Sequence, residues 1–265
     1  MKTSGILRKM SVELNGEIKY YFHLNGGKDE EVNACLGKEF ELKWTGEIHC
    51  INCGKSIKKT YQGFCYDCFT TAPQAAPCIV KPELCEAHLG KGRDVAWEES
   101  HHNQPHFVYL AQTSSVKVGV TRTTQIPTRW IDQGAWRTII IAETPYRKLA
   151  GDIEIELKQY LSDRTDWRQM LVNTCGEEDL EILRDQMISF LPADLSKYAI
   201  SDAEVNEFSY PVPKYPKKVS SINLDKEKTA SGTLMGIRGQ YLFFDEGRVI
   251  NLRKYSGYSV EINCS

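Results

Sequence analysis

The chain has 265 residues, which is enough for one large domain or for two to three small ones. Its hydrophobic content of 41% and charged content of 26% are those of an ordinary soluble globular protein. The longest apolar runs, such as TIIIA at 138–142, are too short to span a bilayer, and the N-terminus lacks an apolar core of the secretory type. We therefore expect a cytoplasmic protein that does not contact membranes. The net charge of −2 excludes the broad basic surplus of most nucleic-acid binders, so such a function would rest on local patches.

The first half of the chain divides into two predicted regions and the start of a third. Residues 1–48 are β-rich, with strand-like runs at 20–24 (YYFHL) and 40–45 (EFELKW). Residues 49–104 are a cysteine-rich segment followed by an irregular connector. Residues 105–175 then alternate β-type runs with helix-type patterns, which predicts a small α/β core.

The second half predicts helices and then a return to strands. Leu149, Ile153 and Leu157 recur at helical spacing, which predicts a helix over 145–161. A second amphipathic helix is predicted at 177–191, within a helical segment that covers 176–210. Residues 211–265 begin with the proline-rich stretch PVPKYP and continue as a β-rich region. Its short strands GRVINL and GYSVEI would be unpaired on their own, so we expect the two terminal β regions to pack together.

Two Cys-x2-Cys pairs separated by eleven residues give the clearest chemical signal in the chain. They supply four thiolates at the spacing of a tetrahedral zinc site. Because protein ligands fill all four positions, the predicted site is structural rather than catalytic. The ligands are Cys50, Cys53, Cys65 and Cys68.

A weaker cluster follows in the connector. Cys85-x2-His88 has metal-ligand spacing, Cys78 lies just before it, and the later group of His101, His102 and His106 offers a fourth ligand, with His106 the member assigned to the set. The spacings are loose, so the alternative is a buried cysteine with exposed histidines and no metal. A nucleophilic Cys85–His88 pair is the less favoured reading, because no acid nearby would orient the histidine.

The stretch HFVYLAQTSSVKVGVTRTTQIPTRW at 106–130 resembles the GIY-YIG nuclease superfamily, in the branch whose second motif reads Lys-Ile/Val-Gly-Val/Ile-Thr. This resemblance covers roughly residues 105–170. The longer string VGVTRTTQIPTRWIDQGAW, the cysteine pairs and SDRTDW also resemble an uncharacterised bacterial family that joins a zinc-ribbon-like segment to such a core. The resemblance implies an α+β protein with a GIY-YIG-like core, a preceding zinc-ribbon-like element and β-rich ends.

The resemblance also implies roles for individual residues. Tyr109 would assist attack of water on a phosphodiester, Arg129 would hold the scissile phosphate, and Glu154 would bind one Mg²⁺ or Mn²⁺ ion. Gly119 would let a substrate or a neighbouring backbone approach closely. Asp152 and Glu156 are on the same predicted helix as Glu154, and periodicity alone cannot choose among the three acids; the family pattern favours Glu154.

The motifs depart from the superfamily pattern, so two functions remain open. The first motif reads Phe-Val-Tyr, and Lys117 replaces the tyrosine of the second motif; Lys117 would either assist Tyr109 or hold phosphate. Arg122 and Arg137 add a modest basic patch for DNA or RNA. One hypothesis is a metal-dependent nuclease with a structural zinc site. The alternative is a catalytically inactive module that binds nucleic acid or a protein partner and uses the fold as a platform.

Overall fold

The computed structural model describes residues 1–24, 30–161 and 165–265. It is a mixed α+β structure, which confirms the predicted class. The first half of the quoted SDRTDW string lies outside the described residues. The chain divides into two compact units, one made of residues 1–70 and 209–265 and the other of residues 71–208. Among the described helices, none combines the length and the apolar character that crossing a bilayer requires.

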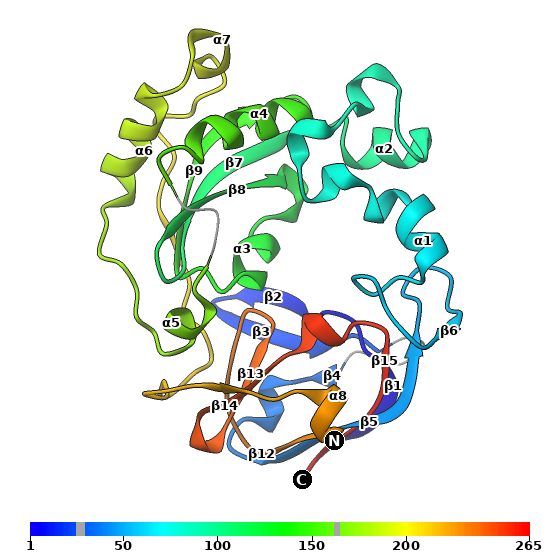
Figure 1. The fold of residues 1–265 in the computed structure, drawn as a ribbon. Helices are drawn as coiled ribbons and strands as arrows, with labels where there is room; N and C mark the ends of the chain where they lie inside the picture. The colour runs from blue at the N-terminus through cyan, green and yellow to red at the C-terminus, as the bar shows by residue number, and fades with distance from the viewer. Residues whose placement is uncertain (25–29, 162–164) are drawn as a thin grey trace. The chain divides into compact units, whose positions relative to one another are not determined.

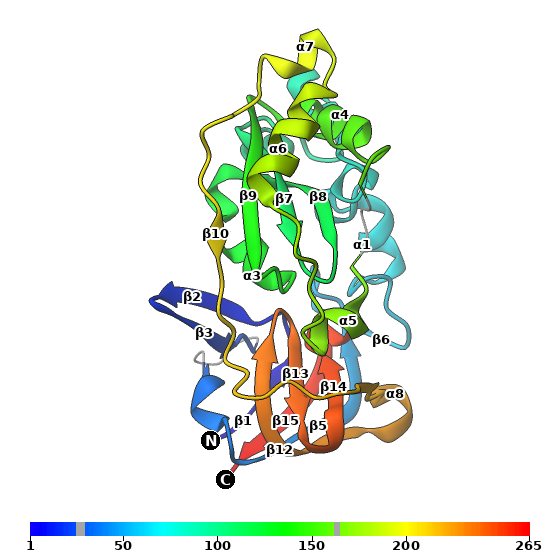
Figure 2. The ribbon, with the colours of Figure 1, turned by 90° about the vertical axis from the view of Figure 1, so that its left-hand side faces the viewer.

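The first unit is built mainly from strands of both chain ends. Its eight-stranded sheet has the order β1-β15-β5-β12-β13-β14-β11, with β6 paired to β5 (Figure 2). The strands are β1 (Lys2–Ile6), β5 (Glu39–His49), β6 (Ser56–Ile57), β11 (Ser220–Ser221), β12 (Thr229–Arg238), β13 (Tyr241–Phe244), β14 (Arg248–Asn251) and β15 (Tyr258–Cys264). The last strand pairs with β1 on one side and with β5 on the other, so the terminal β regions form one sheet as expected.

Three further features complete this unit. A separate sheet of β2 (Ser11–Asn15), β3 (Glu17–Phe22) and β4 (Glu30–Glu31) follows β1. Two short helices, α1 (Tyr66–Thr71) and α8 (Leu224–Glu227), flank the strands in sequence. A disulfide joins Cys35 to Cys264 across 229 residues of sequence.

The second unit is built around an antiparallel sheet with the order β10-β9-β7-β8. Figure 1 labels β9, β7 and β8, and Figure 2 labels all four strands. The strands are β7 (His106–Gln112), β8 (Val116–Arg122), β9 (Arg137–Thr144) and β10 (Asn206–Glu207). The helices are α2 (Val95–His101), α3 (Thr128–Asp132), α4 (Arg147–Leu157), α5 (Trp167–Leu171), α6 (Leu180–Ser189) and α7 (Ala193–Ser196).

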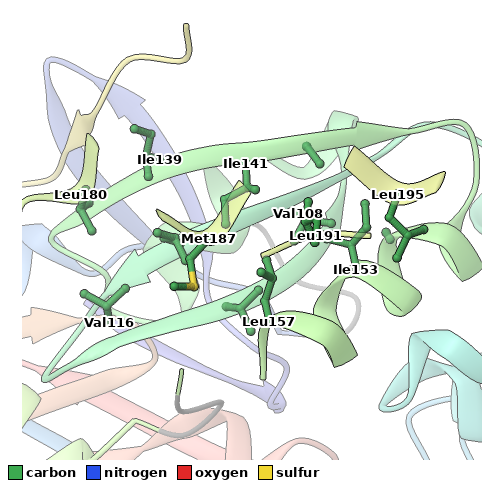
Figure 3. Packing of buried hydrophobic residues seen from close by; sticks show 14 residues of the cluster. Val108, Val116, Ile139, Ile141, Ile153, Leu157, Leu180, Met187, Leu191 and Leu195 are labelled. Atoms are coloured by element: carbon green, nitrogen blue, oxygen red, sulfur yellow. The ribbon is translucent and has the colours of Figure 1, made fainter. Parts of the chain in front are cut away.

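Alternation along the strands gives this sheet two different faces. Val108, Leu110 and Val118 point to one face, where they belong to one buried cluster with Ile153 and Leu157 of α4. Figure 3 labels Val108, Ile153 and Leu157 in this cluster. Met187 of α6 belongs to the same buried cluster. Tyr109 lies between two of these strand residues and therefore points to the opposite face, where its ring contacts Trp130 of α3. The fold thus places α4 and α3 on opposite faces of the strand that carries Tyr109.

The connector that precedes β7 is a series of short 3-10 turns. They are η2 (Pro73–Ala75), η3 (Pro77–Ile79), η4 (Pro82–Leu84) and η5 (Ala87–Leu89). The turn η4 packs against α4 at Gly151, where a Cβ atom would lie 2.2 Å from the backbone nitrogen of Glu83. A residue without a side chain is therefore needed at this crossing, and it allows the connector to approach α4 closely.

Candidate functional site: two cysteine-based groups and the Tyr109 face

The four cysteines of the two Cys-x2-Cys pairs come together at the end of β5. Their sulfur atoms all lie within 4.8 Å of one another. Sγ of Cys53 is 3.9 Å from Sγ of Cys65. Two thiolates on one tetrahedral zinc ion lie about 3.8 Å apart, given Zn–S bonds of about 2.3 Å. Cys53 is exposed, whereas the other three cysteines are buried. The group is therefore shaped to hold a metal ion near the surface of the first unit.

Neighbouring N–H groups point at these sulfur atoms. The backbone N–H of Cys68 donates to Sγ of Cys65 at 3.4 Å, and Nδ2 of Asn52 donates to Sγ of Cys68 at 3.4 Å. Burial raises the pKa of Cys50, but hydrogen bonds from the backbone of Cys53, Cys65 and Asn52 outweigh it and lower that pKa to about 6. Such donors stabilise the thiolate form, which is the form that binds metal.

A second group of metal-ligating side chains lies in the other unit. The potential ligand atoms of Cys78, Cys85, Glu98 and His102 all lie within 4.8 Å of one another, and all four residues are buried. His102 follows the last residue of α2, one turn after Glu98, and the two form a short ion pair through Nδ1 and Oε2. The hydrogen bond from Cys78, together with that from His102, lowers the pKa of Cys85 to about 4, against the effect of burial.

The sequence had placed His88 and His106 in this second group, and the structure places both elsewhere. His88 stacks on the ring of Tyr146, with centroids 4.4 Å apart. His106 is fully buried on β7, where Nδ1 contacts the carbonyl of Gln104 at 2.7 Å. Cys78 and Cys85 lie together, and Glu98 and His102 join them in place of the two predicted histidines. His106 is held on β7 within the sheet, while α2 and the residue after it bring Glu98 and His102 next to the two cysteines.

Tyr109 lies on the face of β7 that is turned toward α3, and it is 1% exposed. Nε2 of Gln133, just after α3, donates a hydrogen bond of 2.7 Å to its hydroxyl oxygen. Gly119 is its partner on β8, and a Cβ atom there would lie 2.8 Å from the hydroxyl oxygen. The space that Gly119 leaves is thus filled by the ring of Tyr109 in this structure.

The other two residues that the resemblance singled out lie near this tyrosine. Burial raises the pKa of Tyr109, the positive charge of Arg129 and the bond from Gln133 lower it, and the charge of Glu154 raises it. The burial effect prevails, so Tyr109 is a neutral phenol at pH 7. Helices α3 and α4 therefore bring Arg129 and Glu154 close enough to Tyr109 to act on it electrostatically.

Glu154 differs from the other two acids of α4. It is buried, and burial raises its pKa, while Lys158 and Arg147 oppose that shift. Nζ of Lys158 is 3.4 Å from Oε2 of Glu154, yet this buried oxygen makes no hydrogen bond with any residue that the structure describes. Asp152 pairs with Lys148 at 2.8 Å, and Oε2 of Glu156 accepts a bond from Gln159 at 2.9 Å. Of the three acids, Glu154 alone has the burial of a site residue.

The predicted basic residues lie along the edges of the same sheet. Lys117 and Arg122 are half-buried on β8, and burial lowers the pKa of Arg122. Nε of Arg137 on β9 lies 3.4 Å from a carboxylate oxygen of Glu207 on β10. Arg137 is therefore already engaged by an acid, whereas Lys117 is on the strand that also carries Gly119.

Several residues of these sites were missed from the sequence. Glu98 was not considered, although it stands four residues before His102, a member of the histidine group, at the spacing of a helical pair. Three other contact residues belong to no motif. Gln133 contacts Tyr109 and Arg147 contacts Cys78 across separate elements of the fold. Lys158 contacts Glu154 from the next helix turn.

Fold and site together define an α+β protein with two buried or half-buried groups of side chains that can hold a metal ion. A family model described as "Protein of unknown function (DUF2797)" matches residues 37–260, so the chain belongs to that family. Neither the curated proteins nor the solved structures contain a significant match to the chain.

Proposed function

We propose that this chain is a metal-dependent nuclease whose site is formed by Tyr109, Arg129 and Glu154. The observation that carries the proposal is that the charges of Arg129 on α3 and Glu154 on α4 both act on the pKa of Tyr109 on β7. Their order along the chain, with Gly119 facing Tyr109, agrees with a GIY-YIG-like core. The antiparallel sheet with α3 and α4 on opposite faces is a further point in its favour.

A divalent cation fits this site through the carboxylate of Glu154. Its Oε2 is buried and makes no hydrogen bond with a described residue, so a ligand atom is available once Lys158 gives way. When bound, such an ion supplies positive charge for the phosphate and acidifies a coordinated water. Binding requires the ionised carboxylate, and the raised pKa of Glu154 therefore makes it compete with protons.

The chain's own residues supply the remaining tasks. Arg129 presents a guanidinium fork that matches two phosphate oxygens. Tyr109 is a neutral phenol and accepts its hydrogen bond from Gln133, so its own proton remains available to orient a water or a phosphate oxygen. Because Tyr109 is 1% exposed, neighbouring side chains must move before it touches a substrate. Lys117 and Arg122 would contact the phosphate backbone beside it.

The test is cleavage of labelled DNA and RNA (single-stranded, duplex, branched and hairpin) with Mg²⁺ or Mn²⁺. Glu154→Gln, Arg129→Ala and Tyr109→Phe should each abolish or strongly reduce cleavage. Glu156→Gln is the matched control, because it removes an acid from the same helix away from Tyr109 and should cleave like the unchanged protein. Equal loss in Glu156→Gln, or full activity in Glu154→Gln, would refute the proposed site.

A catalytically inactive binding module is the second candidate, and two contacts favour it. Lys158 already neutralises Glu154, and Tyr109 is satisfied by Gln133 and shielded from solvent. Such a module would bind nucleic acid in a salt-dependent way without cutting it, and Lys117→Ala would weaken binding. If the protein bound no nucleic acid, this second candidate would be a module that binds a protein partner.

We also propose that the four clustered cysteines of the first unit hold a structural zinc ion. Two pairs of thiolates at tetrahedral distances, with N–H donors to the sulfurs, suit zinc better than a metal that prefers oxygen. Cys53→Ser should lower the zinc content by one ion per chain, whereas Cys175→Ser, which changes a cysteine outside the group, should not.

A further inference from the structure

We propose that Cys78, Cys85, Glu98 and His102 hold a second zinc ion, which fastens the connector to the first turn of α4. This inference does not depend on the nuclease proposal. It replaces the set that the sequence suggested with a complete set of four ligands, two of them from a helix.

The geometry is that of a closed site. Sγ of Cys78 lies 3.8 Å from Nδ1 of His102. Sulfur and nitrogen ligands of one tetrahedral zinc ion lie about 3.6 Å apart, given Zn–S of about 2.3 Å and Zn–N of about 2.0–2.1 Å. All four residues are buried, with exposed fractions between 2% and 8%. Two thiolates, one imidazole and one carboxylate fill four positions, which is the coordination of a structural zinc ion.

The connector has almost no hydrophobic core of its own. Its buried cluster consists of Ala76, Cys78, Cys85 and Ala87. Its larger apolar side chains point to solvent instead: Ile79, Val80, Leu84, Leu89 and Val95 are 36–68% exposed. A segment that buries cysteine, histidine and glutamate while exposing valine and leucine cannot be stabilised by apolar burial. Small segments of this kind are stabilised by a metal or by disulfides.

Without a metal, the same four side chains would be costly to bury. Glu98 and His102 form an ion pair in which each side chain is 4% exposed. Removing two charges from water costs about as much as their attraction returns. Gly92 makes room for the carboxylate arm, because a Cβ atom there would lie 2.3 Å from Cγ of Glu98. A zinc ion between the carboxylate, the imidazole and the two thiolates would compensate all four groups at once.

The group is joined to α4 by hydrogen bonds from adjacent atoms. Nε of Arg147 donates to the carbonyl of Cys78 at 3.0 Å, and Nη2 donates to the carbonyl of Ile79 at 3.0 Å. The backbone N–H of Arg147 donates to the carbonyl of His102 at 2.9 Å. Arg147 thus contacts the backbone of two of the four ligands, while Gly151 one turn later receives Pro82 and Glu83. The zinc centre would hold both contact points of the connector on α4.

The first measurement is the zinc content and zinc coordination of the full-length chain purified without added metal. We expect two ions per chain, one for each group, and an X-ray absorption spectrum with a mixed shell of sulfur and nitrogen or oxygen. One ion per chain with an all-sulfur shell would overturn the proposal. This measurement needs no variant, so impaired folding of a mutant cannot obscure it.

Variants of the proposed ligands, each compared with a variant of an adjacent residue, then test which side chains bind the zinc ion. Glu98→Gln and His102→Gln should each lose one zinc ion, while Glu99→Gln and His101→Gln, next to them on α2, should keep both. His88→Gln should also keep both ions, because the ring of His88 stacks on Tyr146 instead. Loss of zinc in His88→Gln together with its retention in His102→Gln would refute this ligand set.

Hydrogen exchange tests whether the zinc centre holds the connector on α4. Cys85→Ser should speed exchange of the amides of 77–89 and of the first turn of α4, with the zinc ion of the other group still bound. Cys53→Ser, which removes that other ion, should leave these amides protected. Unchanged exchange in Cys85→Ser would show that the centre does not hold the connector on α4.

Discussion

Gln133 donates a hydrogen bond of 2.7 Å to the hydroxyl of Tyr109, and this bond joins the end of α3 to the middle of β7. The oxygen that accepts it is buried, so removing the donor leaves a polar atom without its partner. We expect Gln133→Ala to lower the free energy of unfolding by about 1–2 kcal/mol. In a Tyr109→Phe background the same change should cost less, because the acceptor is already absent.

A double-mutant cycle by urea denaturation measures this coupling. Equal costs of Gln133→Ala in both backgrounds would show that the bond does not contribute to stability.

Gly119 is predicted to tolerate no side chain while Tyr109 is present. A Cβ atom would lie 2.8 Å from both Cζ and the hydroxyl oxygen of Tyr109, so the aromatic ring would have to move. We expect Gly119→Ala to destabilise the protein by about 1–3 kcal/mol, as other overpacked positions do. If the nuclease proposal holds, it should also reduce cleavage by displacing Tyr109. In a Tyr109→Leu background, Gly119→Ala should lower the free energy of unfolding by less, because the aromatic ring is absent; urea denaturation of the four proteins measures the difference.

His106 should remain neutral well below the pH at which a free histidine takes up a proton. Burial lowers its pKa to about 3, whereas the unfolded chain protonates it near about 6.5. The folded state then binds fewer protons, so stability falls by about 1.4 kcal/mol per pH unit as the pH drops from about 6.5 toward 3. The contribution is fully present above about pH 6.5.

NMR titration of the imidazole signals provides the check. The signal that disappears in His106→Gln should not shift between about pH 7.5 and about pH 5, although it should titrate in urea. A midpoint near neutrality in the folded protein would contradict the buried, neutral state.

The bond between Cys35 and Cys264 should contribute strongly to stability, because it closes a loop across 229 residues. Constraining the unfolded chain in this way contributes on the order of 2–5 kcal/mol. We expect Cys264→Ser to lower the melting temperature and to make it insensitive to a mild reductant that leaves zinc bound. Cys175→Ser, which changes a cysteine outside the disulfide, should melt like the unchanged protein.

Local patterns in the sequence were enough for the features that depend on near neighbours. The Cys-x2-Cys spacing indicated the four-cysteine group, since a tight turn brings such residues together wherever the segment lies in the fold. Periodic apolar residues indicated α4 and α6, although both helices are shorter than predicted. Thr144 is the last residue of β9, and α4 therefore begins only at Arg147.

Tertiary structure alone determined the features that depend on contacts between distant elements. Glu98 and His102 lie next to Cys78 and Cys85 because of how α2 packs against the connector that precedes it. The spacing of these residues in the sequence does not predict that packing. The pairing of Cys35 with Cys264 requires β15 to lie in the central sheet next to β5. The burial of Tyr109, and of Glu154 rather than Asp152 and Glu156, also follows from packing around α4 and β7. Burial depends on what lies opposite a residue rather than on what lies beside it in the chain.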